Sequence, residues 1–278
     1  MPASTPAVAA LLLANAAHLM GAFRIMDHSR GGRLEAAQST GGVGEGQSKG
    51  IAVVSICYPD PTPYSGGGGL RVAGPWKRIC GMVRKNFQEY CGRHGYRLLF
   101  HDRKPEGLEG RPATWSKVLA LQDALSQDGV EYAFWMDADS LFMNFSKPLE
   151  LLLPTGSKSV TISGDANCKF NGGHIMLRRG AWASSFLNET WSLWPPPEPW
   201  DEQSAMLYLL TGRQKACRSE SKPCCRRPTT SACDERRQRE MNSYIEDFKR
   251  GDFILHFAGE ASDEKAEDMA NYDELTKG

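Results

Sequence analysis

The chain has 278 residues, of which 41% are hydrophobic and 24% are charged, and this balance is typical of a soluble globular protein with one large α/β domain or two small ones. Lysine and arginine together number 33, as do aspartate and glutamate, so the formal net charge is zero. A neutral chain has no general attraction to nucleic acid or to an anionic membrane surface, and we expect no nucleic acid among its partners.

The N-terminal region contains an apolar segment at residues 6–23 and a Gly/Ser-rich segment at residues 29–50. The apolar segment is short for a membrane span, which needs about 20 residues, and no Lys or Arg precedes it. A signal peptide, a weak Golgi anchor and a poorly ordered leader are therefore all open interpretations. We expect a leader or anchor with a flexible stem over 1–50, a folded domain over 51–260 and a polar tail over 261–278.

The first half of the folded region alternates between strands and helices. Short apolar runs predict buried strands, and apolar residues spaced three and four apart predict helices. On these grounds we expect strands at 51–57, 96–100 and 132–136, and helices at 76–94 and 115–126. This order predicts an α/β fold with a parallel sheet covered by helices, in which ligands bind beyond the carboxyl ends of the strands. Ser55 and Asp137 would then lie at the same edge of the sheet.

The second half is less regular. We expect short strands at 160–163 and 174–177, helices at 182–194 and 201–210, and a last strand at 253–257 that closes the core. Between them, an insert at about 213–240 holds half of the eight cysteines: Cys217, Cys224, Cys225 and Cys233. Their spacing fits no standard zinc pattern, so disulfides in a secretory compartment are favoured over a zinc site. Two glycosylation sequons, at Asn144 and Asn188, agree with that location.

Two aspartates follow the third predicted strand. Alternate residues of an extended chain point the same way, so Asp137 and Asp139 can present two oxygen ligands to one cation such as Mn²⁺ or Mg²⁺. The ordinary alternative is that Asp139 or Ser140 caps a following helix. His256 lies near the end of the last strand, just before a small-residue turn, and an imidazole there can complete the same cation site. A histidine in the hydrophobic core is the alternative.

Two further segments are candidates for contact with a substrate. Asp201, Glu202 and Gln203 open a predicted helix, where acidic residues are favoured by the helix dipole even without a function. Asn171, Gly172 and Gly173 form either a simple turn or a backbone that approaches a ligand closely.

The motifs, taken in order, resemble those of glycosyltransferase family 34, which includes plant xyloglucan xylosyltransferases, galactomannan galactosyltransferases and fungal Golgi α-1,6-mannosyltransferase subunits. The resemblance runs from about residue 51 to residue 259. It rests on segments at 90–96 (YCGRHGY), 115–118 (WSKV), 135–142 (WMDADSLF), 171–182, 201–205 (DEQSA), 242–244 (NSY) and 251–259 (GDFILHFAG). In that family a Cys and then a Lys often follow the last motif, whereas Glu260 and Ala261 follow it here.

The resemblance implies a GT-A type nucleotide-sugar-binding fold, with a mixed, mostly parallel sheet flanked by helices. It also implies a location in the Golgi lumen and a metal-dependent retaining transfer of a hexosyl or pentosyl group to a glycan. It implies Mn²⁺, with Mg²⁺ as the alternative, held by Asp137, Asp139 and His256. It assigns Lys117 to the donor phosphates and places Gln203, with Asp201 and Glu202, beside the donor sugar. The remaining donor-side candidates are Ser55, Asn171, Gly172, Gly173 and Gly259.

The competing hypothesis is a non-catalytic subunit that binds glycan or acts as a scaffold in a Golgi glycosyltransferase complex. Under either hypothesis, a homo- or hetero-oligomer with other glycosyltransferases is an expected form of assembly.

Overall fold

The computed structural model describes residues 50–58, 73–164, 170–196, 201–212, 241–259 and 262–276. These residues all belong to one structural unit, Leu34–Gly278. The apolar leader segment, the stem and the cysteine-rich insert lie outside the described residues. Among the helices that are described, none is long and apolar enough to cross a membrane.

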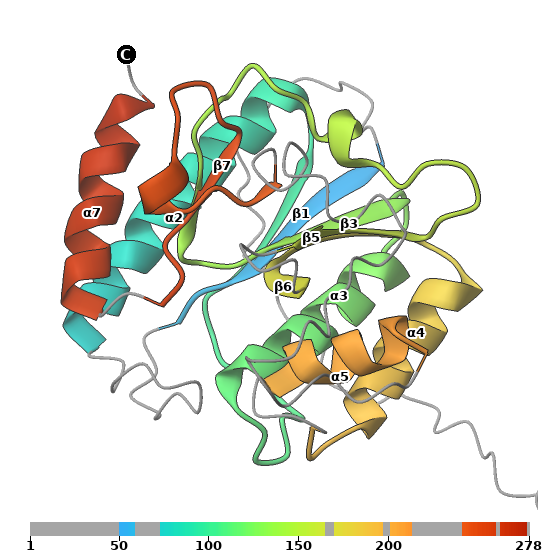
Figure 1. Cartoon of the computed structure of the whole chain (residues 1–278). Coiled ribbons are helices and arrows are strands. Elements are labelled where there is room, and N and C mark those ends of the chain that lie inside the picture. The colour runs from blue at the N-terminus through green and yellow to red at the C-terminus, as the bar shows by residue number, and fades with distance from the viewer. Residues whose placement is uncertain are drawn as a thin grey trace, which may run out of the picture. The chain divides into compact units, whose positions relative to one another are not determined.

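The centre of the fold is a five-stranded sheet in the order β2-β1-β3-β6-β5. Strands β1 (Ile51–Ile56), β2 (Arg97–His101) and β3 (Tyr132–Met136) are parallel, as the sequence pattern predicts. Strand β6 (Phe170–Arg178) runs antiparallel to β3, and β5 (Val160–Gly164) runs antiparallel to β6. Four of the five strands therefore point the same way, and the expected mixed, mostly parallel sheet flanked by helices is confirmed (Figure 1).

Helices cover both faces of the sheet because both faces are apolar. On one face, β1 directs Ile51 and Val53 into the cluster that α2 (Ala73–His94) completes. On the other face, Ala52 and Val54 pack with α3 (Ser116–Ser126), which follows the short 3₁₀ turn η1 (Ala113–Trp115). Helices α4 (Ala181–Ser192) and α5 (Asp201–Leu210) lie beyond α3 on this second side (Figure 1). The predicted apolar stripe of α2, formed by Ile79, Val83, Phe87 and Tyr90, is fully buried.

The last strand packs in the core, as expected, but it is not part of the main sheet. Strand β7 (Ile254–His256) pairs instead with β4 (Ser140–Phe142) in a separate antiparallel two-stranded sheet. The residues after Asp139 thus form a strand rather than the helix that would need a cap. The chain leaves the main sheet at the turn after Met136, so the next extended segment pairs with β7, outside the five-stranded sheet. The 3₁₀ turns η2 (Leu149–Leu152) and η4 (Ile245–Asp247) lie in the connections.

The segment that we expected to be a polar tail contains helix α7 (Ser262–Leu275). Its sequence is strongly charged, which hides a narrow buried face. Ala266 and Met269 belong to the cluster that α2 completes, and Phe248 and Phe257 meet the ring of Tyr272. Figure 1 shows α7 lying alongside α2. Three side chains spaced three residues apart are enough to dock a helix whose other faces are polar.

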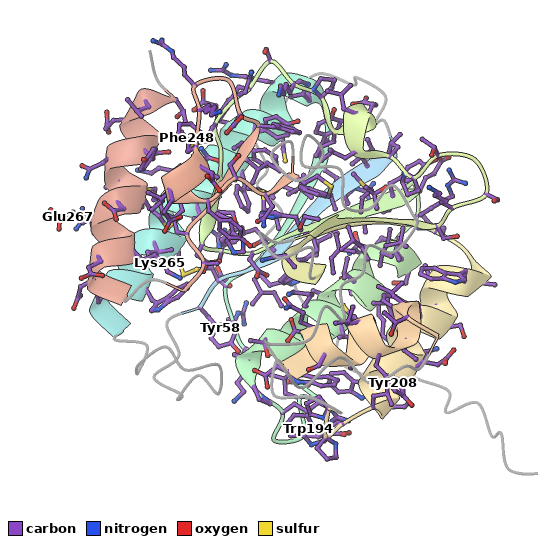
Figure 2. All side chains as sticks on the ribbon, in the orientation of Figure 1. Tyr58, Trp194, Tyr208, Phe248, Lys265 and Glu267 are labelled. Atoms are coloured by element: carbon purple, nitrogen blue, oxygen red, sulfur yellow. A yellow bond between two sulfur atoms is a disulfide. The ribbon has the colours of Figure 1, made fainter. Side chains whose placement is uncertain are left out.

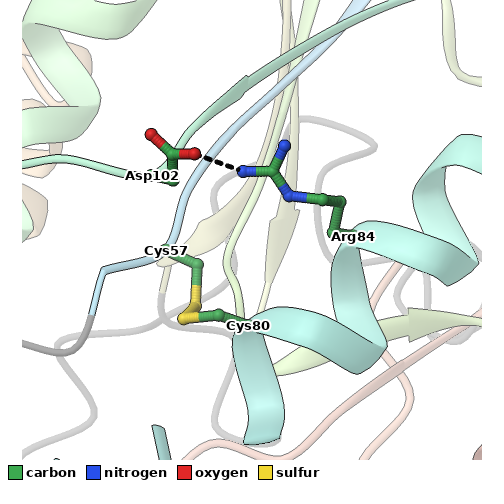
Figure 3. The surroundings of a disulfide bond; sticks show 4 residues. All are labelled: Cys57, Cys80, Arg84 and Asp102. Carbon is green, nitrogen blue, oxygen red and sulfur yellow. Dashed lines mark hydrogen bonds and ion pairs between the residues drawn. A yellow bond between two sulfur atoms is a disulfide. The ribbon is translucent and has the colours of Figure 1, made fainter. Parts of the chain in front are cut away.

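A disulfide that the sequence did not suggest joins Cys57, just after β1, to Cys80 in α2. The bond connects residues 23 positions apart and ties the carboxyl end of β1 to the helix that covers it. The ion pair between Arg84 and Asp102, 2.9 Å apart, lies beside it (Figure 3). Cys91 is a buried free thiol.

The buried histidine at the end of β2 predicts a pH dependence of stability. Burial lowers the pKa of His101, although Asp123 and Asp102 act in the opposite direction. In the unfolded chain this imidazole titrates near 6.5, so below that pH the unfolded state binds a proton that the folded state does not. The wild type should therefore lose stability relative to His101→Gln as the pH is lowered from 7 to 5.5. The difference between their unfolding free energies should decrease by at most about 1.4 kcal/mol per pH unit. Urea unfolding of both proteins at several pH values measures this difference, and a difference that stays constant with pH would contradict the assignment.

Candidate functional site

Two segments that are far apart in sequence meet at the carboxyl end of β3. The main-chain N–H of Asp137 donates to the carbonyl of Gly173 at 2.9 Å, which holds the turn to the neighbouring strand β6. The N–H of Phe257 donates to the carbonyl of Asp139 at 2.8 Å, and Ser140 pairs with His256 across β4 and β7. The backbone alone therefore brings His256 beside the two aspartates.

The side chains of Asp137, Asp139 and His256 converge. One ligand atom from each lies within 4.8 Å of the other two, and His256 Nε2 is 3.3 Å from Asp139 Oδ1. His256 is buried, whereas the carboxylates keep a partial opening to solvent, with Asp137 30% and Asp139 17% exposed. Two oxygens and one nitrogen at this separation fit a single divalent ion with bonds near 2.1 Å.

The ring of His256 is held with one nitrogen toward the aspartates. Its Nδ1 lies 2.7 Å from Asn242 Oδ1, an oxygen that can only accept, so Nδ1 donates to it and Nε2 is the nitrogen that faces the aspartates. The same oxygen lies 3.1 Å from Nδ1 of His174, whose Nε2 is 3.0 Å from the Ser140 hydroxyl. Burial, and then the neighbouring His256, hold the pKa of His174 well below its usual range, so His174 serves as a neutral support.

The Asn171-Gly172-Gly173 segment forms part of the site and is not a simple turn. Asn171 accepts from the Gly173 N–H at 2.7 Å through Oδ1 and donates to Tyr244 Oη at 2.8 Å through Nδ2. A Cβ at Gly173 would lie only 2.5 Å from His256 Cε1. This position must therefore be glycine for the imidazole to occupy its place.

A second charged group adjoins the first. Lys117 is buried and donates to the Gly172 carbonyl at 2.6 Å and to Glu202 at 2.8 Å, and its Nζ lies 3.4 Å from Asp137 Oδ1. Gln203 Oε1 accepts from the Gly172 N–H at 2.8 Å. The start of α5 is thereby attached to β6 and to the first aspartate.

Trp135 and Lys265 each hold one oxygen of an aspartate. Trp135 donates through Nε1 to Asp137 Oδ1 at 2.5 Å. Lys265, from α7, lies 2.6 Å from Asp139 Oδ2 (Figure 2 labels this lysine). Burial alone would raise the pKa of Asp139, but Lys265 and His256 outweigh it and hold that pKa well below its usual range.

Sequence reasoning missed Lys265. It lies in the run Ser-Asp-Glu-Lys-Ala-Glu-Asp, which reads as an ordinary solvated helix surface. Trp135 and Asn242 lie within the motifs, but their sequence context does not indicate what they do. The structure shows that they hydrogen-bond to Asp137 and His256, respectively.

The remaining three candidate residues are Ser55, Gly259 and Asp201. Ser55 is fully buried in β1, and its hydroxyl has no hydrogen-bond partner among the described residues. Gly259 is exposed, at φ +83°. Asp201 begins α5 in the left-handed region, at φ +49°, and is largely buried.

The known proteins that this chain resembles in sequence are glycosyltransferases. Residues 73–159 match the family described as the galactosyl transferase GMA12/MNN10 family. "Probable glycosyltransferase 6" of Oryza sativa subsp. indica is 28% identical over 161 residues, covering 47% of this chain and 32% of that protein. "Xyloglucan 6-xylosyltransferase 2" of Arabidopsis thaliana is 26% identical over 164 residues, covering 48% and 34%. The match thus spans about a third of the length of these relatives.

Among solved structures, a glycosyltransferase involved in the glycosylation of the major capsid of PBCV-1 superposes with a TM-score of 0.57 at 15% identity, covering 80% of this chain and 98% of that one. This similarity shows the fold, which is of the GT-A type. The sheet order, the motifs at their expected places and the matches in sequence agree. The family match over residues 73–159 and the similarity to these relatives support the resemblance to glycosyltransferase family 34.

Proposed function

We propose that the chain is a glycosyltransferase in which Asp137, Asp139 and His256 hold a divalent cation that binds the diphosphate of a nucleotide-sugar donor. The observation that carries this proposal is the convergence of the three side chains at the carboxyl edge of the sheet, with His256 Nε2 directed toward Asp139. Mg²⁺ favours oxygen ligands, whereas Mn²⁺ also accepts an imidazole, so we propose Mn²⁺ with Mg²⁺ as the alternative.

The bound cation would offset the negative charge of the departing nucleoside diphosphate. The protein's own residues position the reactants. Lys117 links Glu202 to Asp137, so we assign Glu202 a positioning role. The side-chain oxygen Oε1 of Gln203 accepts a hydrogen bond from the Gly172 N–H. We therefore propose that the side-chain NH₂ group of Gln203 donates a hydrogen bond to the donor sugar.

We further propose a retaining transfer of a hexosyl or pentosyl group to a glycan, on the basis of the match to the galactosyl transferase family and of the relative named as a xyloglucan 6-xylosyltransferase. The anomeric configuration of the product, measured by NMR, tests retention. The competing function is a non-catalytic glycan-binding or scaffolding subunit.

The purified chain should hydrolyse at least one of UDP-xylose, UDP-galactose and GDP-mannose, and a chelator should abolish the hydrolysis until Mn²⁺ is restored. Asp137→Asn should lower the rate about 100-fold, because the ion loses a charged ligand. Asp137 is a better target than Asp139, whose loss would leave Lys265 buried and unpaired.

The matched control is Asp102→Asn, which removes a surface carboxylate paired with Arg84 and should leave the rate unchanged. Hydrolysis that withstands chelation would refute the metal proposal. Binding of Mn²⁺ and donor without any turnover would favour the non-catalytic subunit.

The close approach of Gly173 to His256 makes the residue at position 173 critical for ion binding. Gly173→Ala should weaken Mn²⁺ binding at least about tenfold, because the new methyl group displaces the imidazole. In Gly172→Ala the new Cβ would meet the flexible ends of Gln203 and Lys117 at 3.2 and 3.4 Å, so Mn²⁺ affinity should stay near that of the wild type. Calorimetric titration with Mn²⁺ compares the two, and equal affinities in both variants would remove His256 from the site.

We also propose a lumenal location in the secretory pathway, because Cys57 and Cys80 form a disulfide and such bonds persist in oxidising compartments.

Mass mapping of the protein from its native host should find the Cys57–Cys80 bond, and disulfides among Cys217, Cys224, Cys225 and Cys233. Free thiols at both Cys57 and Cys80 in freshly isolated protein would contradict the lumenal location. Zinc bound by the insert would contradict only the predicted pairing of the other four.

A further inference from the structure

The side chain of Lys265 places an ammonium group within the candidate cation site. It lies on α7, whose neighbouring residues Ala266 and Met269 are anchored in the core. The side chain is buried, with its ammonium 2.6 Å from Asp139 Oδ2 and 5.8 Å from the centre of the Trp76 ring. Figure 2 shows it pointing inward from α7, whereas Glu267 points away from the protein. Because the helix is docked and the side chain enclosed, the ammonium cannot simply leave when another cation arrives.

The two oxygens of Asp139 have different partners. Oδ2 accepts from Lys265, and Oδ1 faces Nε2 of His256 at 3.3 Å. A divalent ion held by His256 and Asp139 would therefore use Oδ1 and share one carboxylate with the ammonium. Two cations on opposite oxygens of one carboxylate repel each other strongly where little water separates them.

The charges of the paired side chains lead to the same conclusion. Asp137, Asp139 and Glu202 are joined by ion pairs to Lys117 and Lys265. Three carboxylates and two ammonium groups give this set a net charge of −1. A divalent ion changes it to +1, and a nucleoside diphosphate beside the ion then offsets the excess positive charge.

We propose that Lys265 is an internal counter-cation that weakens divalent-ion binding to Asp137, Asp139 and His256 until a nucleoside diphosphate is bound. Ion and nucleotide then bind cooperatively, and the coupling acts equally in both directions, since each ligand changes the affinity for the other by the same factor. In the absence of both ligands, Lys265 balances the charge of Asp139. This inference rests on the proposed function.

A purely structural role for Lys265 makes the opposite prediction. If the lysine only oriented Asp139, its removal would loosen a ligand and weaken ion binding. If it acts as a counter-cation, its removal strengthens ion binding and weakens nucleotide binding. Damage to the site does not tighten the binding of an ion, so the direction of the change separates the two roles.

The test measures Mn²⁺ affinity without nucleotide, and UDP and GDP affinity at saturating Mn²⁺, by calorimetry. Lys265→Met should bind Mn²⁺ at least about fivefold more tightly than the wild type does. It should bind whichever of UDP and GDP the wild type binds at least about fivefold more weakly than the wild type does. Lys265→Arg keeps the charge and should stay near the wild type in both. Lys158→Met removes an exposed lysine just before β5, at the end of the sheet opposite to the candidate site. This variant should change neither affinity.

Thermal unfolding shows whether each variant is folded. Lys265→Gln, which keeps a donor for Asp139 without the charge, replaces the methionine variant if that one does not fold. Unchanged or weaker Mn²⁺ binding by a folded neutral variant would overturn the counter-cation role while leaving the metal site intact. Failure of the wild type to bind Mn²⁺ both with and without nucleotide would instead overturn the proposed function itself.

Discussion

The candidate site depends on the pairing of β4 with β7. The N–H of Phe257 binds the carbonyl of Asp139, and His256 lies opposite Ser140 in the register. These contacts connect a segment near residue 139 to one near residue 256 through the main chain, so the side chains at the site do not have to hold the two segments together. The N–H of His256 also donates to the Ser243 carbonyl at 2.8 Å, which extends the connection to the Asn242 segment. Main-chain hydrogen bonds in a buried setting fix positions more firmly than exposed side-chain pairs do.

In each candidate ligand, one side-chain atom is held by a neighbouring residue. Asn242 holds Nδ1 of His256, Trp135 holds Oδ1 of Asp137, and Lys265 holds Oδ2 of Asp139. Such supports determine the orientation of a ligand and reduce the rearrangement that binding requires. They come from β3, from the segment before η4 and from α7, so the geometry depends on the fold as a whole.

The strands and helices of the main sheet could largely be predicted from the sequence, because each depends on a local pattern of apolar residues. An apolar strand that ends in Asp137, and the spacing of Ile79, Val83 and Phe87 in α2, follow from simple periodicity. The separation of β4 and β7 from the main sheet could not be predicted, since it depends on a turn after Met136 and on pairing across more than a hundred residues. Helix α7 and Lys265 were missed for a different reason: a narrow buried face in a charged helix resembles a solvated surface. The Cys57–Cys80 disulfide was hidden because four other cysteines cluster in the insert.

The two buried lysines also explain how a fold can carry three clustered carboxylates without an ion. Buried carboxylates that repel one another destabilise a fold unless cations or hydrogen bonds offset the repulsion. Lys117 lies between Glu202 and Asp137, and Lys265 pairs with Asp139. The same charges that stabilise the ligand-free protein oppose a divalent ion, so the site trades ion affinity for stability. A donor that carries its own negative charges removes this opposition, and the protein thereby binds the ion most tightly when the substrate is present.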